Sequence, residues 1–195
     1  MRLLGVLGAL LVTAFESNAS ANPYDDLRAK SSLVTSDDLQ RRLDLILSRC
    51  RGRLDRETRL TCNTEATGEY RQLQAIVFRA TARAQLGRYD FEKKRFPLRV
   101  FAELGRAIRL PPAPGWLDQN REPPVFQTYV SVPELDDAAG LRTAEATIAA
   151  EILFRFASKY QSVRDLGTVE IDLLGALVLG PEGRVLAASP TLPKK

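Results

Sequence analysis

The stretch VEIDLLGALVLGPEGRVLAA, residues 169–188, decides the fold class of this chain. Apolar side chains recur at alternate positions from Val169 to Leu179, a pattern that predicts a strand with one buried face. Residues 180–183 (GPEG) form a turn sequence, and residues 184–188 return as a short strand. The stretch therefore predicts a β-hairpin near the C-terminal end of the chain.

Upstream of this hairpin the sequence predicts two more strands and one long helix. Residues 96–110 alternate in a way that favours a strand, although their apolar residues also fit helical spacing. Residues 125–132 are rich in β-branched and aromatic side chains, which predicts another strand. The longest predicted helix covers residues 136–160, with an apolar stripe at Leu141, Ala144, Ile148, Ile152, Phe156 and Tyr160. The order β-β-α-β-β predicts an antiparallel sheet covered by a helix.

The N-terminal half is predicted to form a helical hairpin over residues 36–87. In TSDDLQRRLDLILSRCRG, residues 35–52, a hydroxyl and two aspartates mark a helix start, and apolar residues follow at helical spacing. A second helix is indicated by the seam of Ala66, Tyr70, Leu73, Val77, Ala80 and Ala84, before Gly87. The two cysteines, Cys50 and Cys62, are expected to form a disulfide across the connection. Together these elements predict one α+β domain over residues 36–188, with the sheet-plus-helix unit over 88–188.

Residues 1–21, MRLLGVLGALLVTAFESNASA, have the pattern of a secretory signal peptide. One arginine precedes an apolar run that is shorter than the roughly 20 residues of a bilayer helix, and small residues follow. Cleavage after Ala21 and a periplasmic or extracellular location are expected, the alternative being an uncleaved anchor. Residues 22–35 are predicted to be a flexible segment, and residues 189–195 a frayed tail.

The composition excludes several kinds of chemistry. The chain of 195 residues has no histidine, so it has no Ser-His-Asp triad, no imidazole base and no histidine-ligated metal. Two cysteines without histidine do not make a usual zinc site. Neither a metal nor a cofactor is expected. The leading hypothesis is a binding or protein-interaction module without catalysis.

Two surfaces are candidates for binding a partner, and the chain is basic, with a net charge of +4. The connection between the predicted helices is rich in arginine, and the residues proposed to bind anions are Arg49, Arg51, Arg53, Arg56 and Arg59. An envelope protein or an anionic envelope component would suit them, whereas the lack of interleaved aromatic residues argues against nucleic acid. The alternative is a solvated helix face. In the proline-rich loop 111–124, Gly115 and Trp116 are a candidate partner contact, unless Trp116 folds back onto the sheet.

Two further functions stay open. A carboxylate-based hydrolase acting on envelope glycan needs two paired acids, and the candidates are Glu134, Asp136 and Asp137, Asp90 and Glu92, or Glu170 and Asp172. Helix-start electrostatics is the preferred explanation for Asp136 and Asp137, and a solvated strand face is the preferred one for Glu170 and Asp172. An inhibitor of a secreted enzyme would use the stiff loop 111–124 as a plug.

A short motif resembles secreted bacterial domains of unknown function. It consists of Tyr89-Asp90-Phe91 and Phe96-Pro97-Leu98, followed by a Val-Pro-acidic helix start and an alternating strand. The resemblance covers about residues 88–180 and implies neither an activity nor site residues.

Overall fold

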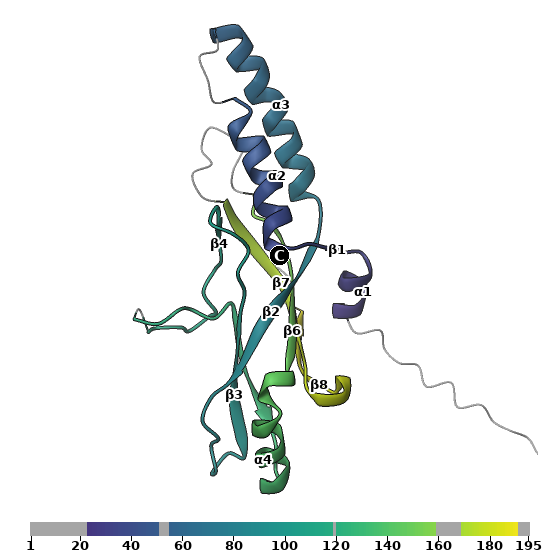
Figure 1. Cartoon of the computed structure of the whole chain (residues 1–195), viewed down its shortest axis with the longest axis vertical. Helices are drawn as coiled ribbons and strands as arrows, with labels where there is room; N and C mark the ends of the chain where they lie inside the picture. The colour runs from purple at the N-terminus through teal and green to yellow at the C-terminus, as the bar shows by residue number, and fades with distance from the viewer. Residues whose placement is uncertain (1–22, 51–54, 119, 159–168, 191–195) are drawn as a thin grey trace, which may run out of the picture.

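The computed structural model describes residues 23–50, 55–118, 120–158 and 169–190, which form an α+β fold (Figure 1). The helices are α1 (Pro23–Ala29), α2 (Ser36–Ser48), α3 (Arg56–Gln74) and α4 (Leu135–Thr143). The strands are β1 (Ser32–Leu33), β2 (Phe78–Leu86), β3 (Arg95–Phe101), β4 (Ile108–Arg109), β5 (Phe126–Ser131), β6 (Ala149–Phe156), β7 (Val169–Leu179) and β8 (Val185–Pro190). Short 3₁₀ turns cover Glu145–Thr147 and Pro181–Gly183.

All the described strands belong to one curled mixed sheet. Its main order is β4-β7-β6-β2-β3-β5, with β1 beside β2 and β8 beside β7. The pairs β1/β2 and β4/β7 are parallel, so the expected purely antiparallel sheet is wrong. The curl brings β5 and β8 close together, and the concave side encloses the core. The predicted hairpin over residues 169–188 is present as β7 and β8.

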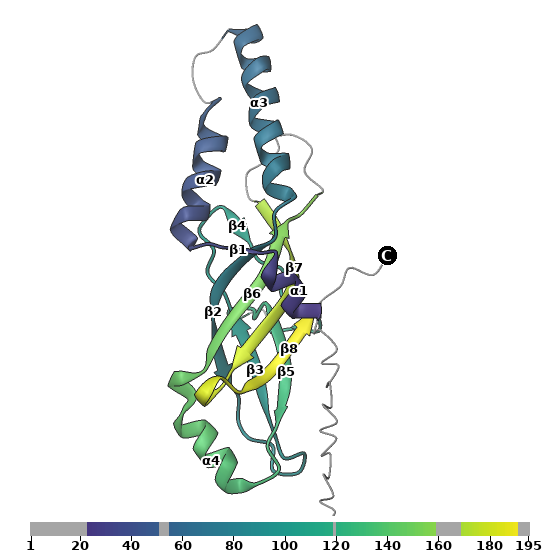
Figure 2. The ribbon, with the colours of Figure 1, turned by 90° about the vertical axis from the view of Figure 1, so that its right-hand side faces the viewer.

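The buried core fills the inside of this curl. Alternate residues of β2 and β6 point inward, and the Phe78 ring lies 5.8 Å from that of Phe154 and 5.5 Å from that of Phe156. Tyr70 of α3 joins this cluster, with its ring centroid 5.9 Å from that of Phe156. Both views show that α2 and α3 rise side by side from one end of the sheet, while α4 lies at the other end (Figures 1 and 2). None of the described helices therefore covers the sheet in the predicted way.

The segment after the predicted leader is ordered, not flexible. Tyr24 of α1 is fully buried against Leu153, Leu174 and Leu177, in a cluster separate from the main core. Helix α1 itself lies against β7 and β8 (Figure 2). The tyrosine hydroxyl donates to Glu151 at 2.7 Å, and burial together with this carboxylate raises the pKa of Tyr24. Arg28 also pairs with Glu151, at 2.6 Å. The prediction of a flexible segment over 22–35 is thus wrong for α1 and β1, because the segment has its own apolar anchor.

The second predicted helix is too long, because residues 78–86 form β2 instead. The helical prediction rests on Val77, Ala80 and Ala84, whose spacing fits a helix. A strand satisfies the same sequence better, since Phe78, Ala80, Ala82, Ala84 and Leu86 alternate with Arg79, Thr81, Arg83 and Gln85. Helix α3 therefore ends at Gln74.

The long helix predicted over residues 136–160 is also wrong. Helix α4 ends at Thr143, and β6 begins at Ala149. The stripe at Ile148, Ile152 and Phe156 has a spacing of four, which is close to one helical turn and is also two periods of a strand. All eight residues of β6, from Ala149 to Phe156, pair with β7, so tertiary pairing decides between the two periods.

Two smaller boundaries differ from expectation. The strand predicted over residues 96–110 is split into β3 and β4 around Gly105, which has a φ of +104°. A φ in this range favours glycine and interrupts a strand. At the other end, Ser189 and Pro190 belong to β8, opposite Ala176 and Gly175, and are not part of a frayed tail. The predicted signal peptide, residues 1–21, and residues 191–195 lie outside the described residues.

Candidate functional site

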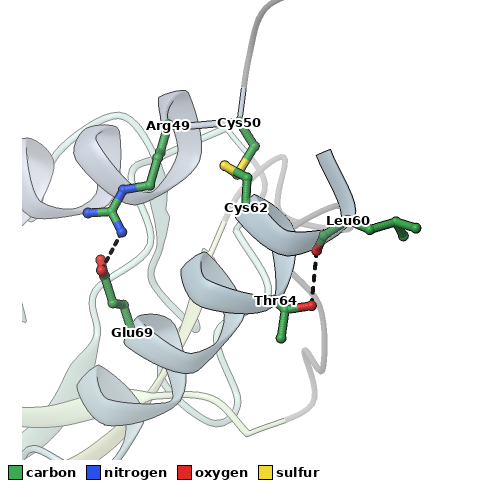
Figure 3. The surroundings of a disulfide bond; sticks show 6 residues. All are labelled: Arg49, Cys50, Leu60, Cys62, Thr64 and Glu69. Atoms are coloured by element: carbon green, nitrogen blue, oxygen red, sulfur yellow. Dashed lines mark hydrogen bonds and ion pairs between the residues drawn. A yellow bond between two sulfur atoms is a disulfide. The ribbon is translucent and has the colours of Figure 1, made fainter. Parts of the chain in front are cut away.

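The first candidate surface is the helix arm, defined as α2, α3 and their disulfide. Cys50 and Cys62 are bonded with their Cα atoms 5.8 Å apart, so the predicted disulfide is confirmed (Figure 3). Arg49 and Glu69 form an ion pair close to this cross-link (Figure 3). Two interactions therefore connect the end of α2 to α3 (one covalent and one ionic).

Helix α3 begins with a side-chain cap from Asp55. The carboxylate of Asp55 accepts the backbone N–H of Thr58 at 2.9 Å and its hydroxyl at 2.6 Å. These hydrogen bonds favour the ionised form and hold the pKa of Asp55 below its ordinary value. Such a cap stabilises the first turn of a helix.

The arginines of the arm are only partly described. Arg51 and Arg53 lie outside the described residues, whereas Arg56 and Arg59 are exposed on the first turn of α3. Acidic residues alternate with them, since Asp55 and Glu57 occupy the same turn. The charge of Arg49 is balanced by Glu69. The described part of the arm is therefore a mixed-charge surface and not a concentrated cationic one.

A second surface lies on the outside of the sheet, over β2, β3 and β5. The strand alternation that buries one set of side chains turns a set of arginines and aromatic rings outward. The register between β2 and β3 places Arg83 opposite Phe101. The register between β3 and β5 places Tyr129 opposite Pro97, which lies between Arg95 and Arg99 on the same face of β3. We call this surface the arginine–aromatic face and define it as Arg83, Arg95, Arg99, Phe101, Trp116 and Tyr129.

Each arginine of this face lies over an aromatic ring. The guanidinium carbon of Arg95 is 3.7 Å from the ring centroid of Tyr129, that of Arg99 is 5.2 Å from Trp116, and that of Arg83 is 4.7 Å from Phe101. These distances are within the range of cation–π attraction. The rings restrict the guanidinium groups to defined positions on the strand face.

Two of these three arginines have no compensating acid among the described residues. Arg83 pairs with Glu122 at 3.3 Å. For Arg95 and Arg99, no acidic side chain within the described ranges has an oxygen within 4.0 Å of a guanidinium nitrogen. The face therefore holds two fixed positive charges that no described carboxylate neutralises.

The proline-rich loop carries Trp116 back to this face. Gly115 has a φ of +79°, which turns the chain, and the backbone N–H of Trp116 donates to the carbonyl of Ala113 at 3.1 Å. Gln127 of β5 donates to the carbonyl of Pro114 at 2.9 Å. Trp116 is half-buried, and its indole N–H has no hydrogen-bond partner among the described atoms. Of the two alternatives, the structure thus has Trp116 folded onto the sheet.

The candidate carboxylates are dispersed over several parts of the fold. Asp136 and Asp137 of α4 line a cavity of about 350 Å³ together with Glu182. Asp90 accepts the backbone N–H groups of Glu92 and Lys93 and so shapes a turn. On β7, the adjacent outward positions hold Glu170 and Asp172, and Asp172 pairs with Arg155 at 3.3 Å. Among these candidates within the described residues, the acids on α4 are the ones that share a cavity with another carboxylate.

The described structure contains neither a metal-ligand cluster nor a helix that could span a membrane. Within residues 23–50, 55–118, 120–158 and 169–190, no three cysteine or acidic side chains gather where a metal ion could be held. Over the same ranges, none of the helices combines the length and the apolar character needed to cross a bilayer.

The sequence prediction missed Arg95, Arg99 and Tyr129 as site residues. Their signal was present, because Arg95, Arg99 and Phe101 occupy alternate positions of a strand-like segment. The pairing of β3 with β5, which brings Tyr129 over the same face, joins segments about thirty residues apart and has no local signature. Comparison with protein-family models, curated proteins and solved structures gives no match that would assign the chain to a family.

Proposed function

We propose that this protein is an exported binding module without catalysis, and that its arginine–aromatic face binds an acidic polysaccharide of the cell envelope. The Cys50–Cys62 disulfide supports export, since such bonds persist in oxidising compartments. The leader-like pattern of residues 1–21 supports it from the sequence. Periplasmic or extracellular location is part of this proposal.

The observation that carries the proposal is the state of Arg95 and Arg99. Each is fixed over an aromatic ring, and neither has an acidic partner among the described side chains. A positively charged group held in place loses little conformational entropy when a carboxylate binds it. With a rise of about 3.3 Å per residue, the two guanidinium groups are anchored roughly 13 Å apart along β3, which suits an extended chain with repeated charges.

The state of the rings favours a polysaccharide over a nucleic acid. Nucleic-acid bases bind to exposed ring faces by stacking. Here Phe101 is only 8% exposed, and the rings of Tyr129 and Trp116 already have guanidinium groups over them. The face therefore offers charge and hydrogen-bond donors more than it offers open ring faces, which suits uronate carboxylates better than base stacking.

Binding of polygalacturonate tests the proposal, with neutral dextran as the uncharged comparison. The Arg95→Gln, Arg99→Gln double variant is expected to weaken binding at low salt by roughly tenfold, because two unpaired cations are lost. The matched control is Arg56→Gln, Arg59→Gln, which removes the same charge from the helix arm and should change affinity less than twofold. Titration calorimetry at low and high salt measures both.

Equal losses in the two variants would contradict the proposal, because binding would then follow net charge alone. Binding that is insensitive to salt would contradict it as well. Thermal unfolding of both variants checks that the fold is retained, because Arg95 and Arg99 are half-buried whereas Arg56 and Arg59 are exposed.

A carboxylate-based hydrolase remains the second candidate, favoured by the cavity that Asp136, Asp137 and Glu182 share. Glycoside hydrolysis needs one acid to donate a proton and another to act as base or nucleophile. Release of reducing ends from envelope glycan, abolished by Asp136→Asn or Asp137→Asn, would establish it. Activity that both variants retain would exclude these acids.

A further inference from the structure

An apolar groove of about 380 Å³ lies between α4 and the turn that connects β2 to β3. Its aromatic lining comes from Tyr89, Phe91 and Phe96, and α4 contributes Leu135. Phe91 is 67% exposed and Leu135 is 60% exposed, which is unusual for such large apolar side chains at one site. We call this site the α4 groove.

The turn and α4 are fixed relative to one another, so the groove is preformed. Arg142 of α4 donates to the carbonyls of Leu86 and Gly87, and its guanidinium carbon lies 5.0 Å from the Phe96 ring centroid. Tyr89 donates to the carbonyl of Val132 at 2.7 Å, and its ring packs against Phe91 and Phe96. These contacts hold the aromatic side chains of the groove and Arg142 in place without a ligand.

The rim of the groove is positively charged. Both charged residues that line it are arginines, Arg88 and Arg142. Arg142 is balanced by Glu145 at 2.7 Å. Arg88 is exposed and has no acidic partner among the described side chains. In the same turn, Lys93 and Lys94 add positive charge, while Asp90 and Glu92 offset it.

We propose that the α4 groove binds a long-chain carboxylate, with the acyl chain over Tyr89 and Phe96 and the head group at Arg88. An apolar interior with one unpaired cation at its edge complements a ligand that has an apolar chain and a single anionic end. The volume is near the lower end of ligand sites, which are about 300–1,000 Å³, so the groove suits one chain better than a two-chain lipid. This site uses none of the residues of the arginine–aromatic face.

A chain-length series tests the proposal, using sodium octanoate, decanoate and dodecanoate below their aggregation concentrations. The protein is expressed from Met1 as the full chain in an oxidising compartment and studied by titration calorimetry. Each methylene removed should weaken binding by about fourfold, because the free energy of burying a CH₂ group is lost. Dodecanol should bind more weakly than dodecanoate, because it has no charge for Arg88.

Three variants separate the groove from non-specific binding. Ala139→Glu places a carboxylate at the groove and should weaken dodecanoate at least tenfold, while Arg88→Gln should weaken it several-fold. The matched control, Arg106→Gln, removes an exposed charge elsewhere and should leave affinity unchanged. Ala139, Arg88 and Arg106 are all exposed, and unchanged thermal unfolding checks that each variant folds.

The proposal is overturned by equal affinities along the chain-length series, or by an Ala139→Glu variant that binds as well as the parent protein. A concentration-dependent dimer that Ala139→Glu dissociates would assign the groove to a second copy of the chain instead. Polygalacturonate binding decides separately on the arginine–aromatic face, so failure of one proposal leaves the other standing.

Discussion

The arginines of the helix arm and those of the sheet face differ in how they are held. In the arm, Arg56 and Arg59 extend from an exposed helix turn that also carries Asp55 and Glu57. On the sheet, Arg95 and Arg99 lie over aromatic rings without a described acidic partner. The arm has more arginines in sequence, yet the sheet has the fixed and uncompensated ones.

This difference teaches that arginine density in a sequence is a poor guide to an anion site. A surface cation that is surrounded by acids gains little from another anion, and it must also be ordered when it binds. A strand face fixes its side chains in alternation, and cross-strand rings remove much of their remaining freedom. The predictions below test whether the two regions are as independent as this contrast requires.

The largest effect is expected from removing the disulfide of the arm. The Cys50→Ser, Cys62→Ser variant should lower the free energy of unfolding by about 3 kcal/mol, because the unfolded chain regains the freedom of the closed loop. Affinity for polygalacturonate should stay unchanged, since the sheet face has its own support. Urea unfolding and titration calorimetry measure the two quantities.

A parallel loss of affinity in this variant at temperatures where the sheet is still folded would break the comparison. It would mean that the arm contributes to the same binding surface. Near-ultraviolet circular dichroism of Trp116, the only tryptophan in the chain, reports whether the sheet face is intact.

A smaller effect is expected from removing the rings beneath the arginines. Tyr129→Leu should weaken polygalacturonate binding about twofold to fivefold, which corresponds to a cation–π contribution of about 0.5–1 kcal/mol. The net charge does not change, so the salt dependence of binding should be that of the parent protein. Tyr129→Phe keeps the ring and is the matched control.

If Tyr129→Phe loses as much affinity as Tyr129→Leu, the hydroxyl and not the ring is responsible. The contrast between the helix arm and the sheet face would then lose its physical basis, because the aromatic rings would not be what makes Arg95 and Arg99 effective in binding. Trp116→Leu offers a second, independent measurement of the same contribution for Arg99.

Sequence patterns predicted well the elements whose periodicity fits only one structure. Helix α2 combines apolar residues at helical spacing with an N-cap at Thr35. The Thr35 hydroxyl accepts the backbone N–H of Asp38, as expected for a helix start. Strand β7 and its turn to β8 were equally clear. By contrast, the Ile148, Ile152 and Phe156 series fits both periods, and only pairing with β2 and β7 decides it.

The candidate site was predicted only in part, for a related reason. Trp116 and the disulfide were visible in the sequence as a rare residue and a cysteine pair. The neighbours of Trp116 depend on the register between β3 and β5, which long-range pairing sets. Arg99 and Tyr129 therefore acquire their role only when the sheet forms.

The smallest effect is the pH response of the arm, which the sheet face should not share. The Asp55 carboxylate caps α3 by accepting two hydrogen bonds from Thr58, so its pKa in the folded protein is below the ordinary value of 3.8. The unfolded chain therefore takes up a proton first as the pH falls. The cap contributes its full stability above the pKa that Asp55 has in the unfolded chain. This contribution is lost as the pH falls through the pKa of Asp55 in the folded protein.

Amide hydrogen exchange at Thr58 between pH 5 and pH 2, corrected for the intrinsic rate, measures this loss against an amide of β3. The matched variant Asp55→Asn also caps a helix but has no titrating carboxyl, so its corrected exchange should change less over the same range. Protection at Thr58 that falls equally in both proteins would show that the cap does not control the arm. Protection in β3 that falls in step with Thr58 would show that the arm and the sheet unfold as one unit, and the two regions would then not be independent.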